Sequence, residues 1–221
     1  MSAWRDRLEA LFSGAAPRGR LEEELAWAAG EFSMRKDNFF LVLEGVETDA
    51  RKSSYTSFEE LESYMYRVAS AVGLSALEIF GWRGENSRAY AENLGYAVQL
   101  TNIIRDVFED ARSRRTYIPL EDFKRFNCDP VSLQNSIYPV NFIELMKFEA
   151  ARARGFYARA RELAEGRDKD KLLSAFIMGR IYSDLLDKIE ARGFRTAGPR
   201  IRLNLFEKIR AVYRAWRHYK S

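Results

Sequence analysis

Two aspartates one helical turn apart, Asp106 and Asp110, are the residues of this sequence whose types and spacing could do chemistry. At about 100° of rotation per residue, a helix through this segment places Gln99, Asn102 and both aspartates within a sector about 80° wide. The surrounding sectors hold apolar residues: Leu100, Ile104, Val107 and Phe108. A solvated polar face is the ordinary interpretation of such a stripe. The lining of a cavity is the alternative, and the broad apolar surface favours it.

Inside a cavity the two carboxylates need a cation, because at about 6 Å in an effective dielectric of about 20 they repel by roughly 3 kcal/mol. Their oxygens suit a hard ion, so Asp106, Asp110 and Asn102 are predicted to bind Mg²⁺ rather than Zn²⁺. Magnesium with so few protein ligands completes its shell with water and substrate phosphates. The predicted ligand is therefore a phosphate or diphosphate, which guanidinium groups bind well. Four arginines surround the stripe: Arg105, Arg112, Arg114 and Arg115.

The run QLTNIIRDVFEDARSRRTYIP resembles the second aspartate-rich motif of the squalene/phytoene synthases, in which Q, N and a D-x-x-x-D pair precede a basic segment and a Y-[IL]-P turn. The matching positions are Gln99, Asn102, Arg105, Asp106, Glu109, Asp110, Arg112, Tyr117 and Pro119. Phe108 stands where the family commonly has glycine, and we interpret it as a packing residue. The resemblance implies that Asp106 and Asp110 are catalytic. It also implies that substrate is bound by Gln99, Asn102, Arg105 and Tyr117.

A second resemblance concerns an apolar channel. The segment YMYRVASAVG is similar to the family's Y-x-Y-x-V-A-G-x-V-G segment, with Ser70 in place of a usual glycine. The resemblance implies that this segment lines the channel for the isoprenoid tails, whereas its periodicity alone indicates ordinary core packing. Leu94 and Val98 precede the polar stripe by two turns and one turn, and they would continue the channel. The predicted wall residues are Tyr64, Val68, Val72, Leu94 and Val98.

The resemblance also assigns roles to residues outside these motifs. It implies that Tyr182 lies near the reacting centre, and the alternative is a half-buried tyrosine with a paired hydroxyl. It implies that Arg200 reaches toward the diphosphate. A segment similar to the family's G-[MV]-E-x-D contains Glu47 and Asp49. We expect structural ion pairs from this flank, with a supporting role at the site as the alternative.

The elements that must position these residues are all helical. Apolar periodicity, caps and breaks predict helices over 4–13, 21–32, 36–51, 58–81, 85–112, 120–127, 140–164 and 168–192. No strand-like alternation, repeat or interdomain linker interrupts this pattern. We therefore expect an all-α, single-domain fold over residues 1–221. It would be a bundle around a central cavity, resembling the isoprenoid synthase architecture.

Composition narrows the function further. The chain has 221 residues, is 47% hydrophobic, and carries a net charge of +4, which is too small to indicate nucleic-acid binding. One cysteine excludes an internal disulfide, and one histidine excludes a multi-histidine metal site. The sequence has no signal peptide and no apolar run approaching about 18 residues, so we expect a cytoplasmic protein.

The implied activity is the head-to-head condensation of two prenyl diphosphates, farnesyl or geranylgeranyl, in isoprenoid biosynthesis of the squalene, carotenoid or hopanoid type. The match begins near Trp4 and lacks the family's amino-terminal helices, which carry the first aspartate-rich motif. We therefore expect an amino-terminally truncated member with impaired turnover, whose exposed apolar wall favours self-association. The alternative is a non-catalytic relative that binds a prenyl lipid or serves in assembly.

The carboxyl-terminal segment, residues 200–221, carries seven basic residues against one acidic residue, Glu207, together with an apolar side. We expect the apolar side to pack on the domain, as terminal helices of bundles usually do. The alternative is a peripheral contact with anionic membrane lipid.

Overall fold

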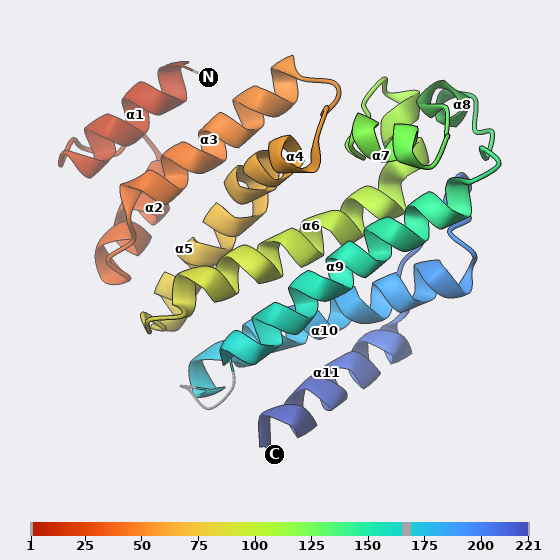
Figure 1. Ribbon diagram of the computed structural model, residues 1–221. Helices are drawn as coiled ribbons and strands as arrows, with labels where there is room; N and C mark the ends of the chain where they lie inside the picture. The colour runs from red at the N-terminus through yellow and green to blue at the C-terminus, as the bar shows by residue number, and fades with distance from the viewer. Residues whose placement is uncertain (1, 165–168, 221) are drawn as a thin grey trace.

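Helix α6 (Ser87–Arg112) runs through the centre of the molecule, and the other long helices pack around it (Figure 1). The computed structural model describes residues 2–164 and 169–220. Apolar residues are buried on several sides of α6, which is why it has neighbours on more than one face. These neighbours include α9 (Phe142–Ala164), η1 (Tyr66–Ser70), α5 (Ala71–Phe80) and α10 (Lys169–Ala191). The described part of the chain contains no strand, so the all-α prediction is confirmed.

Four of the remaining helices follow the predicted ranges closely: α1 (Ser2–Phe12), α2 (Arg20–Glu31), α3 (Lys36–Arg51) and α7 (Leu120–Arg125). Helix α4 (Phe58–Met65) begins at the predicted residue, whereas α8 (Pro130–Gln134) and α11 (Leu205–Lys220) lie outside the predicted ranges. Local capping explains two of the starts, because the Ser57 hydroxyl accepts from the Glu60 amide at 3.3 Å and the Asp129 carboxylate accepts from the Val131 amide at 3.0 Å. The predicted helix start at Asp168 lies outside the described residues.

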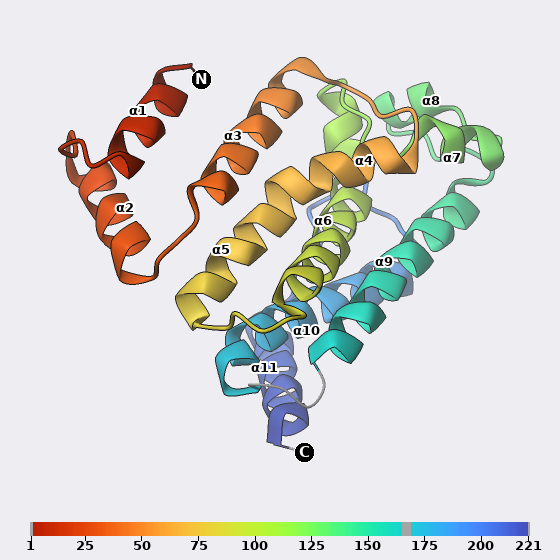
Figure 2. The same cartoon turned by 60° about the vertical axis from the view of Figure 1, so that its left-hand side comes forward.

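The prediction of one unbroken α-helix over 58–81 is wrong. The segment forms α4, then the π-helix η1, then α5, and α5 lies beside α6 (Figure 2). A π-turn holds more residues than an α-turn, so side chains beyond it are rotated relative to those before it. Tyr64 is accordingly 6% exposed while Val72 is 51% exposed. Gly95 of α6 permits the close packing on η1, because a Cβ there would lie 2.9 Å from the Cα of Ser70.

Two loops tie the end of α3 to the end of α6. The backbone amide of Thr116 donates to the Ser53 carbonyl at 2.7 Å, and that of Leu120 donates to the Tyr55 carbonyl at 2.9 Å. An isolated parallel bridge joins Ser54 and Thr116. These shared hydrogen bonds satisfy both backbones and fix the two loops together. The carboxyl ends of α3 and α6 therefore meet at one end of the bundle.

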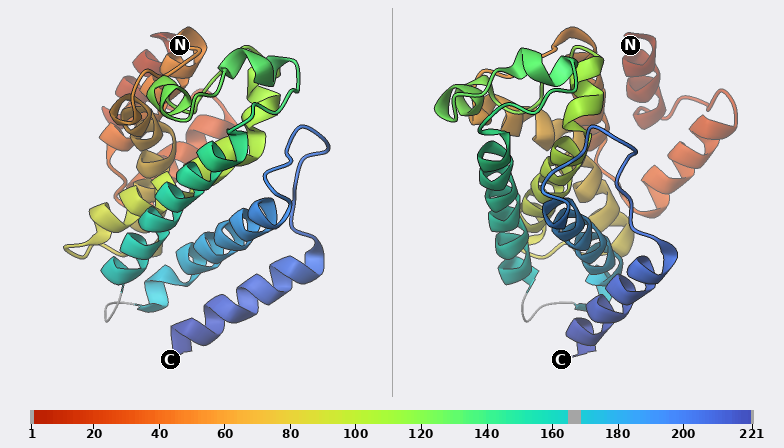
Figure 3. Two further views of the ribbon diagram at one scale, coloured as in Figure 1. Left: turned by 45° about the vertical axis from the view of Figure 1, so that its right-hand side comes forward. Right: turned by 90° about the vertical axis from the view of Figure 1, so that its right-hand side faces the viewer.

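Helix α11 lies against α10 at the edge of the molecule (Figure 3). Its buried residues are small, since Ala211 is 0% and Ala215 6% exposed, and small side chains let two helices approach closely. Phe206, Ile209 and Tyr213 are 83%, 56% and 55% exposed. The expectation that the apolar side of this segment packs on the domain is therefore wrong for its large side chains. No helix in the described part of the chain has the length and apolar character needed to cross a membrane.

Candidate active site

Asp106 forms the centre of an ion cluster at the carboxyl end of α6. Arg105 donates to its two oxygens at 2.7 and 2.5 Å, and Arg200 donates to the same oxygens at 3.1 and 2.6 Å. Arg200 comes from the loop between α10 and α11, which brings that loop to α6. Burial raises the pKa of Asp106, but the hydrogen bonds from both guanidinium groups outweigh it, so the pKa lies below its usual value. The site therefore holds an ionised carboxylate between two side chains suited to phosphate.

Asp110, one turn further along, is in a different electrostatic state. Burial raises its pKa to about 7, and repulsion from Asp106 and Glu109 adds to the effect. Within residues 2–164 and 169–220, its carboxylate has no hydrogen-bond or ion-pair partner, and neither has the side-chain amide of Gln99 or Asn102. All three side chains are partly buried. The predicted polar stripe thus exists, and most of it lacks protein partners, which is the condition in which a ligand or ion would satisfy it.

Asp49 of α3 fixes two tyrosines beside this stripe. It accepts hydrogen bonds from the hydroxyls of Tyr64, at 3.1 Å, and Tyr117, and from Arg115 at 2.8 Å. The rings of Tyr64 and Tyr117 stack with their centroids 5.6 Å apart. Burial, followed by the hydrogen bond to Asp49, raises the pKa of Tyr117 to about 12. A small cavity of about 10 Å³ is lined by Asp110, Arg115 and Tyr117, so the cluster adjoins the aspartate face.

Asp49 is the residue whose importance sequence reasoning underestimated. Its only signal was the G-V-E-x-D segment, and we preferred structural ion pairs there. That preference is right for Glu47, which lies 3.6 Å from Arg5. It is incomplete for Asp49, because the ion pair with Arg115 also anchors two tyrosine hydroxyls.

The predicted apolar residues do not form one continuous wall. Val68 faces α3, where a Cβ on Gly45 would lie 2.5 Å from its Cγ1. Val72 is half exposed, and Val98 is partly buried against the core. Leu94 instead lines a cavity bordered by α9, α10 and α11. The π-helix accounts for the separation of Val68 from Val72, and the channel role of these residues stays a prediction.

Tyr182 lies half buried on α10 and packs against the core. Its hydroxyl has no hydrogen-bond partner in the part of the chain that the structure describes. Its role at the reacting centre stays a prediction. Phe108 is a packing residue, as expected, since it is 0% exposed with its ring 4.6 Å from that of Tyr138.

The donor set fits a magnesium ion only in part. Asp106, Asp110 and Asn102 offer two carboxylates and an amide on one helix face, which suits an ion that takes its other ligands from water and phosphates. Asp110 has no competing partner, whereas Asp106 already accepts four hydrogen bonds from arginines. The described residues contain no group of three or more His, Cys, Asp or Glu side chains arranged to hold a metal. Any ion here would therefore depend on phosphate oxygens.

A helical bundle with a carboxylate pair and arginines at one end of its central helix defines an isoprenoid synthase-type protein. The family model of squalene/phytoene synthase matches residues 1–207, and the chain belongs to this family. It is 33% identical to the phytoene synthase of Arthrospira platensis over 93% of this chain and 71% of that protein. It is 31% identical to the presqualene diphosphate synthase of Zymomonas mobilis over 92% of this chain and 69% of that protein.

A solved structure of a dehydrosqualene synthase in complex with ligand superimposes with a TM-score of 0.88 at 25% identity. The superposition covers 100% of this chain and 79% of that one. The chain thus spans roughly two thirds to four fifths of these relatives, with 66% of the 15-cis-phytoene synthase of Synechocystis as the lower figure.

Proposed function

We propose that this chain takes part in the head-to-head condensation of two prenyl diphosphates, farnesyl or geranylgeranyl. The observation that carries the proposal is the pairing of Asp106 with Arg105 and Arg200 beside the unpartnered Asp110. Further support comes from relatives named phytoene synthase and presqualene diphosphate synthase. The proposal includes Mg²⁺, with Asp106, Asp110 and Asn102 as its protein ligands.

Arg105 and Arg200 can bind either the carboxylate of Asp106 or the diphosphate of the substrate. When bound, Mg²⁺ would offset the charge of the diphosphate and make it a better leaving group. Arg105 and Arg200 would exchange part of their bonds to Asp106 for bonds to diphosphate oxygens, which are equally suited to the guanidinium fork. The carboxylate released in this exchange becomes available to the cation. Substrate and metal would therefore bind together rather than singly.

The remaining residues would protect the carbocation left when the diphosphate departs. Asp49 holds the Tyr64 and Tyr117 rings stacked and orients them, and aromatic faces attract cations. Tyr182 would contribute a further ring, and apolar side chains would exclude the water that quenches a cation. The proposed substrate-binding set is Tyr64, Val68, Val72, Leu94, Val98, Gln99, Asn102, Arg105, Tyr117 and Arg200.

Calorimetric titration with a non-hydrolysable farnesyl diphosphate analogue tests the site. With Mg²⁺ present, we expect Asp106→Asn and Asp110→Asn each to weaken binding at least tenfold, about 1.4 kcal/mol. The control is Asp37→Asn, which removes the same charge from the exposed first turn of α3. Equal affinity in all three variants would show that Asp106 and Asp110 do not bind the analogue.

A turnover assay separates catalysis from binding. We expect the isolated chain to bind the analogue and to form little product from farnesyl or geranylgeranyl diphosphate, because the described residues contain no group of three or more acidic, histidine or cysteine side chains arranged to hold a metal. Binding with no product at any enzyme concentration would favour the non-catalytic alternative, a prenyl-lipid-binding or assembly protein. Product at a normal enzymatic rate would show that the described ligands suffice.

We also propose a peripheral contact between α11 and membranes for this otherwise cytoplasmic chain. Phe206, Ile209 and Tyr213 are uncovered on a helix that also carries Arg210 and Arg217, the composition of an interfacial helix. Co-sedimentation with liposomes should rise with anionic lipid, fall with added salt, and drop in an Arg210→Gln/Arg217→Gln variant. The competing occupant of this face is a second copy of the chain. Sedimentation velocity showing a concentration-dependent dimer without lipid binding would favour self-association.

A further inference from the structure

A second cavity lies at the opposite end of α6 from the aspartates. It has a volume of about 260 Å³, is partly open to solvent, and is bordered by α6, α9, α10 and α11. Its floor is apolar and includes Tyr90, Leu94 and Phe176. Leu94 precedes Asp106 by 12 residues, which is about 18 Å along an α-helix. The cavity is therefore distinct from the ion cluster around Asp106, and Leu94 is the residue that it shares with the proposed apolar channel.

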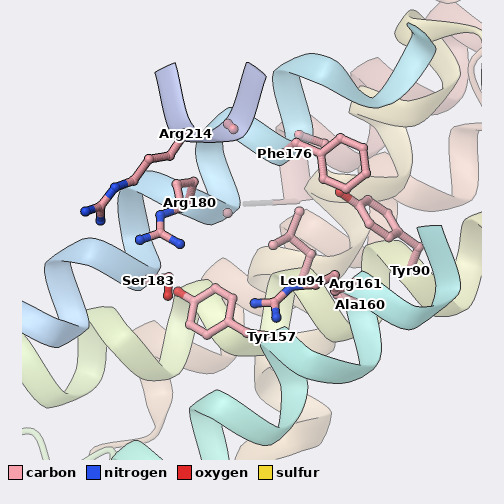
Figure 4. Close-up of a pocket in the computed structure, with 12 residues that line it drawn as sticks. Tyr90, Leu94, Tyr157, Ala160, Arg161, Phe176, Arg180, Ser183 and Arg214 are labelled. Carbon is pink, nitrogen blue, oxygen red and sulfur yellow. The ribbon is translucent and has the colours of Figure 1, made fainter. Parts of the chain in front are cut away.

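The other end of this cavity is basic. Figure 4 shows the guanidinium groups of Arg161 and Arg180 reaching the same space from α9 and α10, beside Tyr157 and Ser183. Arg214 of α11 completes the lining on that side. Three different helices thus each contribute one arginine to a single small cavity.

The charges of this cavity are incompletely balanced. Asp184 lies 2.6 Å from Arg180 and is 6% exposed, so it offsets one positive charge. The contact lacks hydrogen-bond geometry, because both oxygens of Asp184 and the Nε of Arg180 are buried without a hydrogen-bond partner. Arg161 and Arg214 have no ion-pair partner within residues 2–164 and 169–220. Among the residues that the structure describes, three guanidinium groups against one carboxylate leave two positive charges at the cavity.

We propose that this cavity binds a small organic phosphate, with its hydrocarbon part on Leu94 and Phe176 and its phosphate among Arg161, Arg180 and Arg214. A phosphate monoester carries about −1.5 to −2 charges at pH 7, which matches the two unbalanced positive charges. Guanidinium groups bind its oxygens in pairs. The cavity volume of about 260 Å³ lies just below the range of about 300–1,000 Å³ that is usual for ligand pockets, so the hydrocarbon is short.

The proposal is tested by calorimetry on the full chain with octyl phosphate in the absence of metal ions. Two further titrations separate the parts of the ligand: inorganic phosphate has the head without the tail, and octanol has the tail without the head. We expect one octyl phosphate per chain, bound at least tenfold more tightly than either part. Inorganic phosphate binding as tightly as octyl phosphate would overturn the assignment of the apolar floor.

Variants locate the binding. Arg161→Gln/Arg214→Gln removes two exposed arginines that have no described partner, so the fold should persist, and we expect at least a tenfold loss of octyl phosphate affinity. The control, Arg195→Gln/Arg202→Gln, removes the same charge from an exposed loop and should bind as wild type does. Equal losses in both variants would mean that net charge alone attracts the ligand. The variant Asp106→Asn tests whether octyl phosphate binds at the aspartate site instead. If Asp106→Asn changes octyl phosphate affinity, the phosphate binds near Asp106 and the proposal fails.

Discussion

Glu149 of α9 should make the stability of this protein fall as the pH rises. Its carboxylate and that of Asp122 share one guanidinium group, with Arg152 donating to Glu149 at 3.0 and 2.8 Å and to Asp122 at 2.9 Å. The two acidic residues are 0% and 3% exposed. Burial raises the pKa of Glu149 to about 8, since one cation cannot balance two carboxylates away from water. The folded protein therefore keeps this proton at neutral pH.

The sign and size of the effect follow from proton linkage. Between the ordinary glutamate pKa of about 4.3 and the folded value of about 8, the folded state binds more protons than the unfolded state, so raising the pH favours unfolding. One such group changes the free energy of unfolding by about 1.4 kcal/mol per pH unit. From pH 5.5 to 7.5, the wild type should lose about 2–3 kcal/mol relative to Glu149→Gln, whose amide does not titrate.

Urea unfolding followed by far-ultraviolet circular dichroism at the two pH values measures this difference. The matched control is Glu144→Gln on the same helix, because Glu144 is exposed and pairs with Lys147 at the surface. We expect its stability to change with pH as that of the wild type does, while Glu149→Gln shows a flatter dependence. If Glu149 were ionised beside Arg152, Glu149→Gln would instead lower stability equally at both pH values. Parallel profiles for Glu149→Gln and wild type would refute the reasoning.

Four other substitutions test the packing and the site. Gly95→Ala should lower the free energy of unfolding by about 1–3 kcal/mol, because its Cβ would collide with the backbone of η1 at 2.9 Å. Gly155→Ala meets only the end of a flexible side chain at 3.5 Å, so it should raise stability by about 0.5–1 kcal/mol in the same urea assay. Asp49→Asn should cost about 1–3 kcal/mol, since a carboxylate with three donors loses its charge. Arg200→Gln should raise the pKa of Asp106, measurable by carboxyl-carbon NMR titration, and an unchanged pKa would show that the ion pair does not form in solution.

Sequence reasoning predicted most reliably where the relevant geometry lies within one helix. The rotation per residue of an α-helix is fixed, so the common face of Asn102, Asp106 and Asp110 followed from spacing alone. No comparable rule predicts which residues of different helices or loops contact each other. Arg200 contacts Asp106 from 94 positions away, and only the family resemblance indicated it. No local pattern of the sequence brings Asp49 to two tyrosines on other elements.

Two predictions about the fold were wrong, the unbroken helix over 58–81 and the packing of the apolar side of α11. In both cases the outcome depends on the neighbouring helix. The propensities of the residues in η1 do not distinguish a π-turn from an α-turn. The structure has the π-turn where α6 approaches closely at Gly95. For α11, the pattern predicted an amphipathic helix but could not decide which residues would be covered. The alanines are buried and the large apolar residues are not, because the surface that α10 offers accepts only small side chains at close approach.

The two arginine clusters along α6 differ in what an anion must displace, and that difference gives a direct test of both. At the aspartate end, Arg105 and Arg200 already bind Asp106, so a phosphate competes with a carboxylate unless a cation occupies that carboxylate. At the Leu94 end, Arg161 and Arg214 have no competing partner in the described chain, so an anion displaces only water. A metal chelator should therefore abolish binding of the farnesyl diphosphate analogue and leave octyl phosphate binding unchanged. Chelator sensitivity of both ligands would mean that they share the aspartate site, and sensitivity of neither would mean that Arg105 and Arg200 exchange partners without a cation.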